Sequence, residues 1–298
     1  MTPSRRIRFF AITFFSFGVF IFLMDSCMQF RMSKSEIAEY FSHQEKKGTL
    51  HEYPVGKGRV INYLHAGDEN LPLVVFVHGS PGSLSAFIHF LTDTALLKRA
   101  QLITVDRAGF GASNFGYAEK SLQKQAQYLK PILEKYKNNK PIILVGHSLG
   151  GPVIARMAMD YPSLVDGLVI VAGSIDPELE PNETWFRAPL ATPFLSWIMP
   201  RSFRASNFEI YKLKPELQEM LPLWKEITCR VKVIQGKKDD LVPPGNADFA
   251  KKMLVNAASV DFILRDDMNH FVPWQHPELI RTAVIQLLDE KNKSAPSR

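Results

Sequence analysis

The chain has 298 residues, of which 46% are hydrophobic and 22% are charged. This composition excludes an intrinsically disordered chain and allows one large domain or two small ones. Two cysteines, Cys27 and Cys229, exclude a disulfide framework and a cysteine-based metal cluster. The net charge of +6 comes from scattered Lys and Arg without interleaved aromatic residues or a known module, so we expect no nucleic-acid partner.

Residues 1–30 have the pattern of a signal or membrane-anchor segment. The arginine cluster Arg5–Arg8 precedes a nearly continuous apolar run over residues 9–24. Three interpretations stay open: an uncleaved anchor, a cleaved secretory signal, and a lipoprotein signal lipidated at Cys27. The last rests on a lipobox-like stretch before Cys27, from which Asp25 departs. In each case the positive cluster stays cytoplasmic, so we expect a membrane-anchored or exported protein with its main domain on the non-cytoplasmic side.

After a polar, helix-prone connector at 31–48, short strands alternate with helices. Most of the predicted strands are uninterrupted apolar runs, typical of strands buried on both faces. They are Arg59–His65, Leu73–Val77, Leu102–Val105, Ile142–Val145, Leu168–Val171, Val231–Ile234 and Val260–Leu264. The predicted helices are Ala86–Leu97, Ser121–Tyr136, Ser148–Tyr161, Asn246–Val255 and Pro277–Asp289. This alternation predicts one α/β domain over 49–290, with a mostly parallel sheet covered by helices on both faces, and then a polar tail at 291–298.

The span from about residue 176 to 223 breaks the alternation. It is rich in proline and contains no strong strand. We expect a short helical lid inserted into the sheet domain. Its aromatic residues suggest an apolar acyl or aryl site, although packing of the lid itself explains most of them equally well; they are Trp185, Phe186, Phe194, Trp197, Phe203 and Phe208.

The most informative stretch is Gly146-His147-Ser148-Leu149-Gly150, which follows a buried strand and precedes a helix. A Gly-x-Ser-x-Gly sequence in this place is typical of a sharp turn that lifts the serine hydroxyl above the sheet. Both flanking positions are glycine because side chains there would collide. Ser148 is therefore the predicted nucleophile, and the following helix N-terminus can stabilise a developing oxyanion.

The loop His78-Gly79-Ser80-Pro81-Gly82 follows another buried strand and is the predicted second half of an oxyanion hole. An oxyanion hole needs one N–H from the residue after the nucleophile, here Leu149, and one from such a loop. Ser80 is the candidate, because Pro81 has no N–H. We expect His78 to brace the loop without titrating during the reaction.

A serine hydroxyl becomes a good nucleophile only when an imidazole takes its proton. In Gly-x-Ser-x-Gly hydrolases the acid and then the histidine follow the serine along the chain. His270, in the loop after the last predicted strand, is the predicted base, whereas His276 at a helix start is expected at the surface. The acid is predicted to be Asp239, with Asp240 as the alternative, since both follow the strand Val231–Ile234.

Together these motifs resemble the α/β-hydrolase fold superfamily, in its serine esterase and lipase branch with an epoxide-hydrolase-like sequence pattern. The resemblance spans roughly residues 53–288 and includes Asp106–Ser113, a stretch that is mainly structural in the family, and Asn269-His270-Phe271, where Asn269 replaces a frequent glycine. It implies an α/β-hydrolase fold with a lid. The serine at 148 argues against relatives that use aspartate there, such as epoxide and haloalkane hydrolases.

The sequence therefore predicts a serine hydrolase that cleaves a small-molecule carboxylic ester through an acyl-enzyme, with no metal or organic cofactor. Other reactions of the same triad remain alternatives: carbon–carbon bond hydrolysis, thioester or amide cleavage, and acyl transfer. A non-catalytic binding protein on the same scaffold is a further alternative. The sequence leaves the oligomeric state open.

Overall fold

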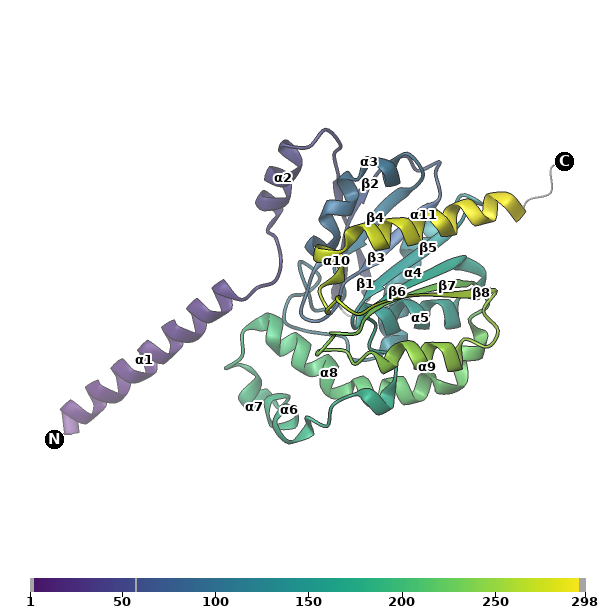
Figure 1. The fold of residues 1–298 in the computed structure, drawn as a ribbon. Helices are drawn as coiled ribbons and strands as arrows, with labels where there is room; N and C mark the ends of the chain where they lie inside the picture. The colour runs from purple at the N-terminus through teal and green to yellow at the C-terminus, as the bar shows by residue number, and fades with distance from the viewer. Residues whose placement is uncertain (1–2, 57, 295–298) are drawn as a thin grey trace.

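The centre of the structure, a computed structural model that describes residues 3–56 and 58–294, is one eight-stranded sheet (Figure 1). Its order is β1-β2-β4-β3-β5-β6-β7-β8. Strand β2 pairs antiparallel with both β1 and β4, and the six strands β3 to β8 are parallel to one another. The strands are β1 (Thr49–Gly56), β2 (Arg59–Ala66), β3 (Leu73–Val77), β4 (Gln101–Val105), β5 (Ile142–His147), β6 (Gly167–Val171), β7 (Arg230–Gly236) and β8 (Ser259–Arg265).

Helices cover both faces of this sheet. One face carries α4 (Leu122–Tyr136), α5 (Gly150–Asp160), the end of α8 (Arg201–Met220), η4 (Leu221–Glu226) and α9 (Gly245–Met253). The other carries α2 (Lys34–Ser42), η1 (Leu84–Thr92), α3 (Thr94–Leu97), α10 (Val272–Gln275) and α11 (Pro277–Ser294). The predicted α/β architecture, with a mostly parallel sheet between two helical layers, is confirmed.

Alternating side chains of the central strands feed two separate cores. In β3, Val75 and Val77 belong to the core on the α4–α5 face, whereas Val74 and Phe76 belong to the core on the α11 face. All five residues of this strand are buried. The period of two explains why these strands are apolar at every position.

Several predicted elements differ from those in the structure. The strand β1 was not predicted, because Thr49–Gly56 is half-exposed at the sheet edge and its polar residues and Pro54 hide the strand pattern. The predicted helix Ala86–Leu97 is instead a 3-10 helix and a separate α3, which Asp93 caps through its side chain. The helix predicted from Ser148 begins at Gly150.

The predicted connector at 31–48 is more than a polar link. Its helix α2 begins with a capping box between Ser33 and Glu36, and it buries Ile37 and Phe41 in the core on the α11 face. At the other end of the chain, α11 continues to Ser294, so the predicted tail lies partly in this helix, and residues 295–298 lie outside the described residues.

The span predicted as an insertion, residues 176–223, is called the lid segment below. It connects β6 to β7 and contains η3 (Pro177–Leu179), α6 (Thr184–Leu190), α7 (Pro193–Ser196) and α8. The short η2 (Pro162–Leu164) lies before β6. That the lid segment acts as a lid over the substrate pocket stays a prediction.

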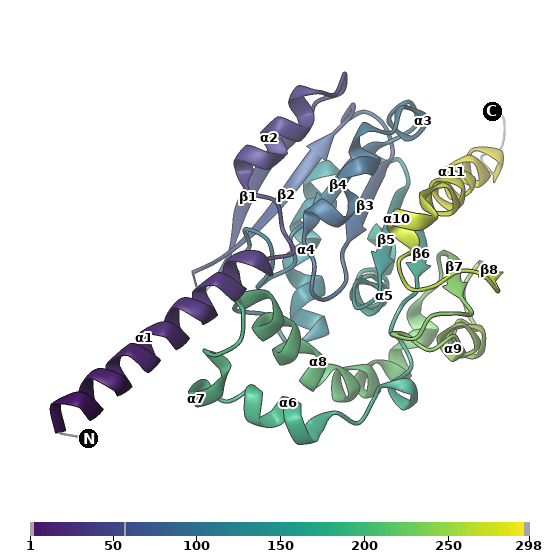
Figure 2. The same ribbon diagram turned by 60° about the vertical axis from the view of Figure 1, so that its left-hand side comes forward.

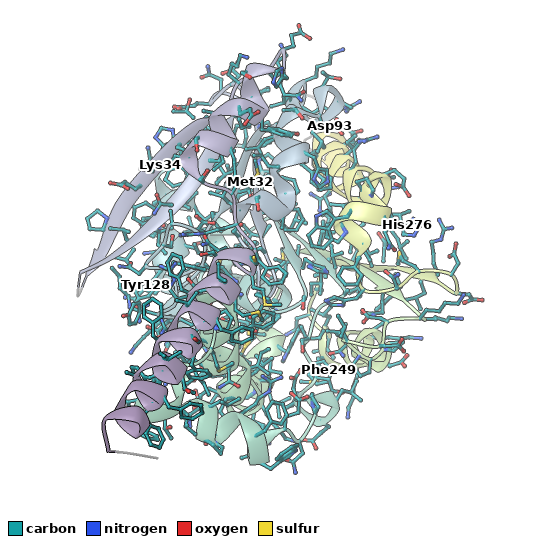
Figure 3. All side chains as sticks on the ribbon, turned by 90° about the vertical axis from the view of Figure 1, so that its left-hand side faces the viewer. Met32, Lys34, Asp93, Tyr128, Phe249 and His276 are labelled. Carbon is teal, nitrogen blue, oxygen red and sulfur yellow. The ribbon has the colours of Figure 1, made fainter. Side chains whose placement is uncertain are left out.

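The N-terminal segment forms one long helix, α1 (Pro3–Cys27), which projects from the domain (Figures 1 and 2). Its stretch Phe9–Cys27 has a mean hydropathy of 1.9, and none of it is buried inside the protein. By length and composition, this stretch can cross a membrane. Figure 3, which looks from this side, shows side chains standing out from the helix into open space.

Candidate active site

Ser148 occupies the sharp turn between β5 and α5. Its φ of 54° lies in the left-handed region, which a non-glycine residue adopts only under local constraint. The turn is held by a bond from its N–H to the carbonyl of Val171, at 2.9 Å. A Cβ at Gly146 would lie 2.4 Å from the Gly150 carbonyl oxygen, and one at Gly150 would lie 2.2 Å from the Val77 carbonyl oxygen. Both glycines are therefore required by close backbone contact.

Asp239 and His270 meet at the carboxyl edge of the sheet. The His270 Nδ1 lies 2.8 Å from the Asp239 Oδ2, and both side chains are buried. The other oxygen of Asp239 accepts the N–H groups of Leu241 and Val242, at 3.0 and 2.8 Å. These bonds hold the carboxylate in one orientation and require the His270 proton on Nδ1. Asp240 is exposed and makes no such contact.

His270 and Ser148 line the same cavity, and the order of strand ends brings them there. Among the described residues, no hydrogen bond joins the Ser148 hydroxyl to the His270 ring. Such bonds are often long in a site without substrate and tighten when the substrate binds. The structure thus brings Asp239 to His270, and His270 and Ser148 to one cavity.

His147 supports this arrangement and was not predicted as a site residue. Its Nε2 donates to the backbone carbonyl of His270, at 2.9 Å, and its ring lies 4.7 Å from the His270 ring. Burial, together with the nearby His270, lowers the pKa of His147 to about 3. His147 is therefore neutral, and its bond holds the loop that carries His270 next to the turn at Ser148. In the sequence, its position between Gly146 and Ser148 was the feature that could have identified His147 as a site residue.

We expect His147→Gln to change how stability depends on pH. In wild type, His147 binds a proton below pH 6.5 only when the chain is unfolded, so folding is weakened by about 1.4 kcal/mol per pH unit between pH 6.5 and 3. The glutamine amide keeps a donor for the His270 carbonyl and does not titrate. The unfolding free energy of the variant relative to wild type should therefore rise by about 2 kcal/mol from pH 7.5 to pH 5 in urea titrations. A pH-independent difference would contradict this account.

The predicted oxyanion loop follows β3 and faces the serine. A Cβ at Gly79 would lie 2.8 Å from the Ser148 Cβ, so only glycine lets the loop approach this closely. The N–H groups of Ser80 and Leu149 donate to no residue in the described part of the chain, and both residues line a cavity with Ser148. The Ser80 hydroxyl is also buried without a partner. Beside Ser148 there are thus donor groups that have no acceptor among the described residues.

The loop is braced from below by His78 and Arg107. His78 is buried, its Nδ1 donates to the Gly79 carbonyl, and its Nε2 accepts the Arg107 N–H at 3.0 Å. Burial and the Arg107 charge hold the pKa of His78 well below its usual range. The Arg107 guanidinium donates to the carbonyls of His78 and Gly79, both at 2.8 Å.

Arg107 also forms a two-pronged ion pair with Glu209 of α8, at 2.7 and 2.9 Å, and both side chains are only 1% exposed. The pair ties the lid segment to the oxyanion loop. The sequence did not reveal it, since the partners lie far apart in the chain and Asp106–Ser113 was identified only as structural.

Replacing Glu209 with glutamine is expected to lower the unfolding free energy by about 3–5 kcal/mol, because it leaves the Arg107 charge buried without its counter-charge. Denaturant unfolding of the full-length protein in detergent measures this loss. The matched control is Glu134→Gln, which breaks an exposed ion pair with Lys130 and should cost less than about 0.5 kcal/mol. Equal effects of the two substitutions would refute the role of the buried pair.

Two cavities meet at Ser148. The first, about 500 Å³, is largely apolar and is lined by Phe30, Ala86, Phe203, Leu241, Phe271 and Trp274 beside Ser148 and His270. The second, about 390 Å³, lies under the lid segment and carries polar groups, including Glu180, Glu183 and Arg187. Burial raises the pKa of Glu180, which accepts a hydrogen bond from Ser174. A bound molecule can thus extend in two directions from the serine. Over the described residues, no three His, Cys, Asp or Glu side chains cluster as a metal site would require.

Comparisons with known proteins agree with this architecture. The sequence profile of the family described as alpha/beta hydrolase fold matches residues 72–205. Human protein ABHD8 is 25% identical over 248 residues, which cover 72% of this chain and 55% of that protein. The mouse sn-1-specific diacylglycerol lipase ABHD11 is 32% identical over 105 residues, covering 35% of this chain and 34% of that protein. This chain thus spans between about a third and just over half of these relatives' length.

Solved structures extend the likeness to the whole chain. The crystal structure of a membrane phospholipase A, described as a bacterial virulence factor, is similar with a TM-score of 0.62 and 16% identity. The similarity covers 98% of this chain and 100% of that one. At this identity the comparison shows the fold alone.

Proposed function

The chain belongs to the α/β-hydrolase fold superfamily, and from this premise we propose that it is a serine hydrolase that cleaves a carboxylic ester. The observation that carries the proposal is the 2.8 Å bond between Asp239 and His270, placed at the same cavity as the strained Ser148. The fold alone supports many chemistries, whereas an oriented imidazole beside a lifted serine supports nucleophilic acyl transfer.

In the proposed reaction, the Ser148 Oγ attacks the ester carbonyl while the His270 Nε2 takes its proton. The N–H groups of Leu149 and Ser80 bind the oxyanion of the tetrahedral intermediate. Asp239 holds the Nδ1 proton and stabilises the imidazolium. The imidazolium then protonates the leaving alcohol, and a water molecule, deprotonated by His270, attacks the acyl-enzyme and releases the acid and free serine.

The two cavities suggest how an ester sits. An acyl or aryl group fits the apolar first cavity, and the alcohol part fits the polar second cavity. The substrate class agrees with the names of similar proteins, one a diacylglycerol lipase and one a phospholipase A. Both of those names denote cleavage of a carboxylic ester.

A fluorophosphonate probe tests the proposal directly. The full-length protein in detergent should react covalently, and mass spectrometry of its peptides should place the adduct on Ser148. A protein that does not react, or that reacts at another serine, would be a binder or a different enzyme. Matched ester, thioester, amide and carbon–carbon substrates then define the bond cleaved, and products formed with glycerol present reveal acyl transfer.

We also propose that α1 anchors the enzyme in a membrane, with the catalytic domain on the non-cytoplasmic side. Of the three interpretations of the N-terminus, the contacts of Asp25 favour the uncleaved anchor. Its carboxylate accepts the backbone N–H of Arg201 at 2.6 Å and pairs with the Arg201 guanidinium at 2.7 Å. Cleavage before Cys27 would remove this cap from α8. Mass spectrometry of the mature protein should find α1 intact, and a lipidated Cys27 as first residue would refute it.

A further inference from the structure

The part of the lid segment from residue 188 to 200 has an unusual surface. It contains no charged side chain, yet only Ser196 in it is buried. Phe194 is 80% exposed, and Trp185, just before this stretch, is also 80% exposed. Exposed apolar surface of this extent in one place marks an interaction site. Charged residues return at both ends, with Arg187 and Arg201.

This stretch lies beside the apolar helix α1. The Trp197 ring contacts the Phe17 ring edge to face, with centroids 6.3 Å apart. Figures 1 and 2 both show α6 and α7 on the side of the domain from which α1 projects. The two apolar segments therefore face the same surroundings, and whatever surrounds α1 at the level of Phe17 also surrounds Trp197.

Polar contacts fix this arrangement at the domain surface. Asp25 caps α8 through Arg201, the Ser202 hydroxyl donates to the Met28 carbonyl, and Phe30 packs on Phe203 with centroids 5.5 Å apart. These contacts join the last turn of α1, and the residues that follow it, to the first turn of α8. The position of α7 along α1 is thus set by the fold.

The depth of Phe17 and Trp197 in a bilayer follows from helix geometry. Phe17 lies eight residues before Asp25, which is roughly 12 Å along a helix that rises 1.5 Å per residue. Half the hydrocarbon core of a bilayer measures about 15 Å. If the charged groups of Asp25 and Arg201 lie at the membrane surface, Phe17 and Trp197 lie well inside one leaflet.

The first cavity opens near Asp25 and Arg201, where α1 meets α8. Phe30 and Phe203, which lie where α1 meets α8, line it together with Ser148. Its other lining residues Phe271 and Trp274 are about half exposed. An apolar mouth next to the membrane surface can receive an acyl chain without passage through water.

We infer that residues 188–200 are embedded in the leaflet that α1 enters, so that the first cavity takes the acyl chain of an ester-bearing lipid directly from the bilayer. The lipid substrate class rests on the proposed function, whereas the embedding does not. The apolar surface of residues 188–200 adjoins α1, which is itself apolar enough to cross a membrane. We therefore expect this surface to contact lipid.

Depth measurements on the full chain test the embedding. In a Cys27→Ser, Cys229→Ser background, the variants Phe194→Cys and Val255→Cys are labelled with a polarity-sensitive fluorophore and reconstituted in phosphatidylcholine and phosphatidylglycerol vesicles. Val255 is the matched control, because it is an apolar side chain 69% exposed in the turn after α9. The label at 194 should be quenched by spin-labelled lipid and protected from aqueous iodide, and the label at 255 should behave in the opposite way.

Activity measurements test the route of the substrate. Phe194 lines neither cavity at Ser148. We therefore expect Phe194→Lys to hydrolyse soluble p-nitrophenyl butyrate within twofold of wild type and to hydrolyse a long-chain diacylglycerol in the same vesicles at least tenfold more slowly. Val255→Lys should change neither rate. A water-exposed label at 194 overturns the embedding, and an unchanged diacylglycerol rate in Phe194→Lys overturns the bilayer route. Failure of wild type on all esters would instead refute the proposed function, while the depth result still decides the embedding.

Discussion

Ser148→Ala is expected to lower kcat/KM for short p-nitrophenyl esters by about 10⁴- to 10⁶-fold, which is the range observed when the nucleophile of such a triad is removed. The hydroxyl makes no hydrogen bond to any described residue, so its loss leaves the turn and its backbone bonds in place. Alanine retains the Cβ and so adds no clash at the φ of 54°. The expected residual rate comes from the oxyanion donors alone.

The measurement is steady-state hydrolysis by wild type and variant, purified in the same detergent. Thermal unfolding should agree within a few degrees between them, which separates loss of chemistry from loss of fold. The fluorophosphonate adduct should also disappear. A variant that keeps full activity would show that another residue is the nucleophile.

Asp239→Asn is expected to lower kcat by about 10⁴-fold. The carboxylate now accepts the His270 Nδ1 proton at 2.8 Å. An asparagine can turn its NH2 toward His270, which favours the tautomer with its proton on Nε2, and that tautomer cannot take a proton from Ser148. The asparagine oxygen can still accept the N–H groups of Leu241 and Val242, so the loop is expected to persist.

The neighbouring Asp240 supplies the matched control, since Asp240→Asn changes an exposed carboxylate of the same loop. Its kcat should stay within twofold of wild type. Both variants are compared with wild type in the same buffer and at the same pH. If Asp240→Asn loses activity and Asp239→Asn does not, the acid has been assigned to the wrong residue.

The central strands of the sheet could be predicted from local sequence patterns. Uninterrupted apolar runs predicted the parallel strands, because each of these strands is buried on both faces. The edge strand β1 was not predicted, because half of its residues face solvent and need not be apolar. In the same way α2 was taken for a connector, because two buried residues, Ile37 and Phe41, are too few to form a clear helical pattern.

The candidate chemistry could be predicted from local sequence. The glycines around Ser148 report a backbone too close for side chains, and the chain order of serine, acid and histidine follows from the order of strand ends along one sheet edge. These constraints act between residues close in the sequence or between the ends of strands, so they can be recognised from the sequence.

The contact of His270 with Asp239, where Asp240 was the alternative, is seen only in the folded chain, and so are the contacts of the lid segment. The pairs Arg107–Glu209 and Asp25–Arg201 join residues more than a hundred positions apart. A charged residue has the same local pattern whether it is solvated or paired, so its partner emerges only when the chain folds. Whether α1 and the lid segment lie together was therefore a question of packing, which no local pattern encodes.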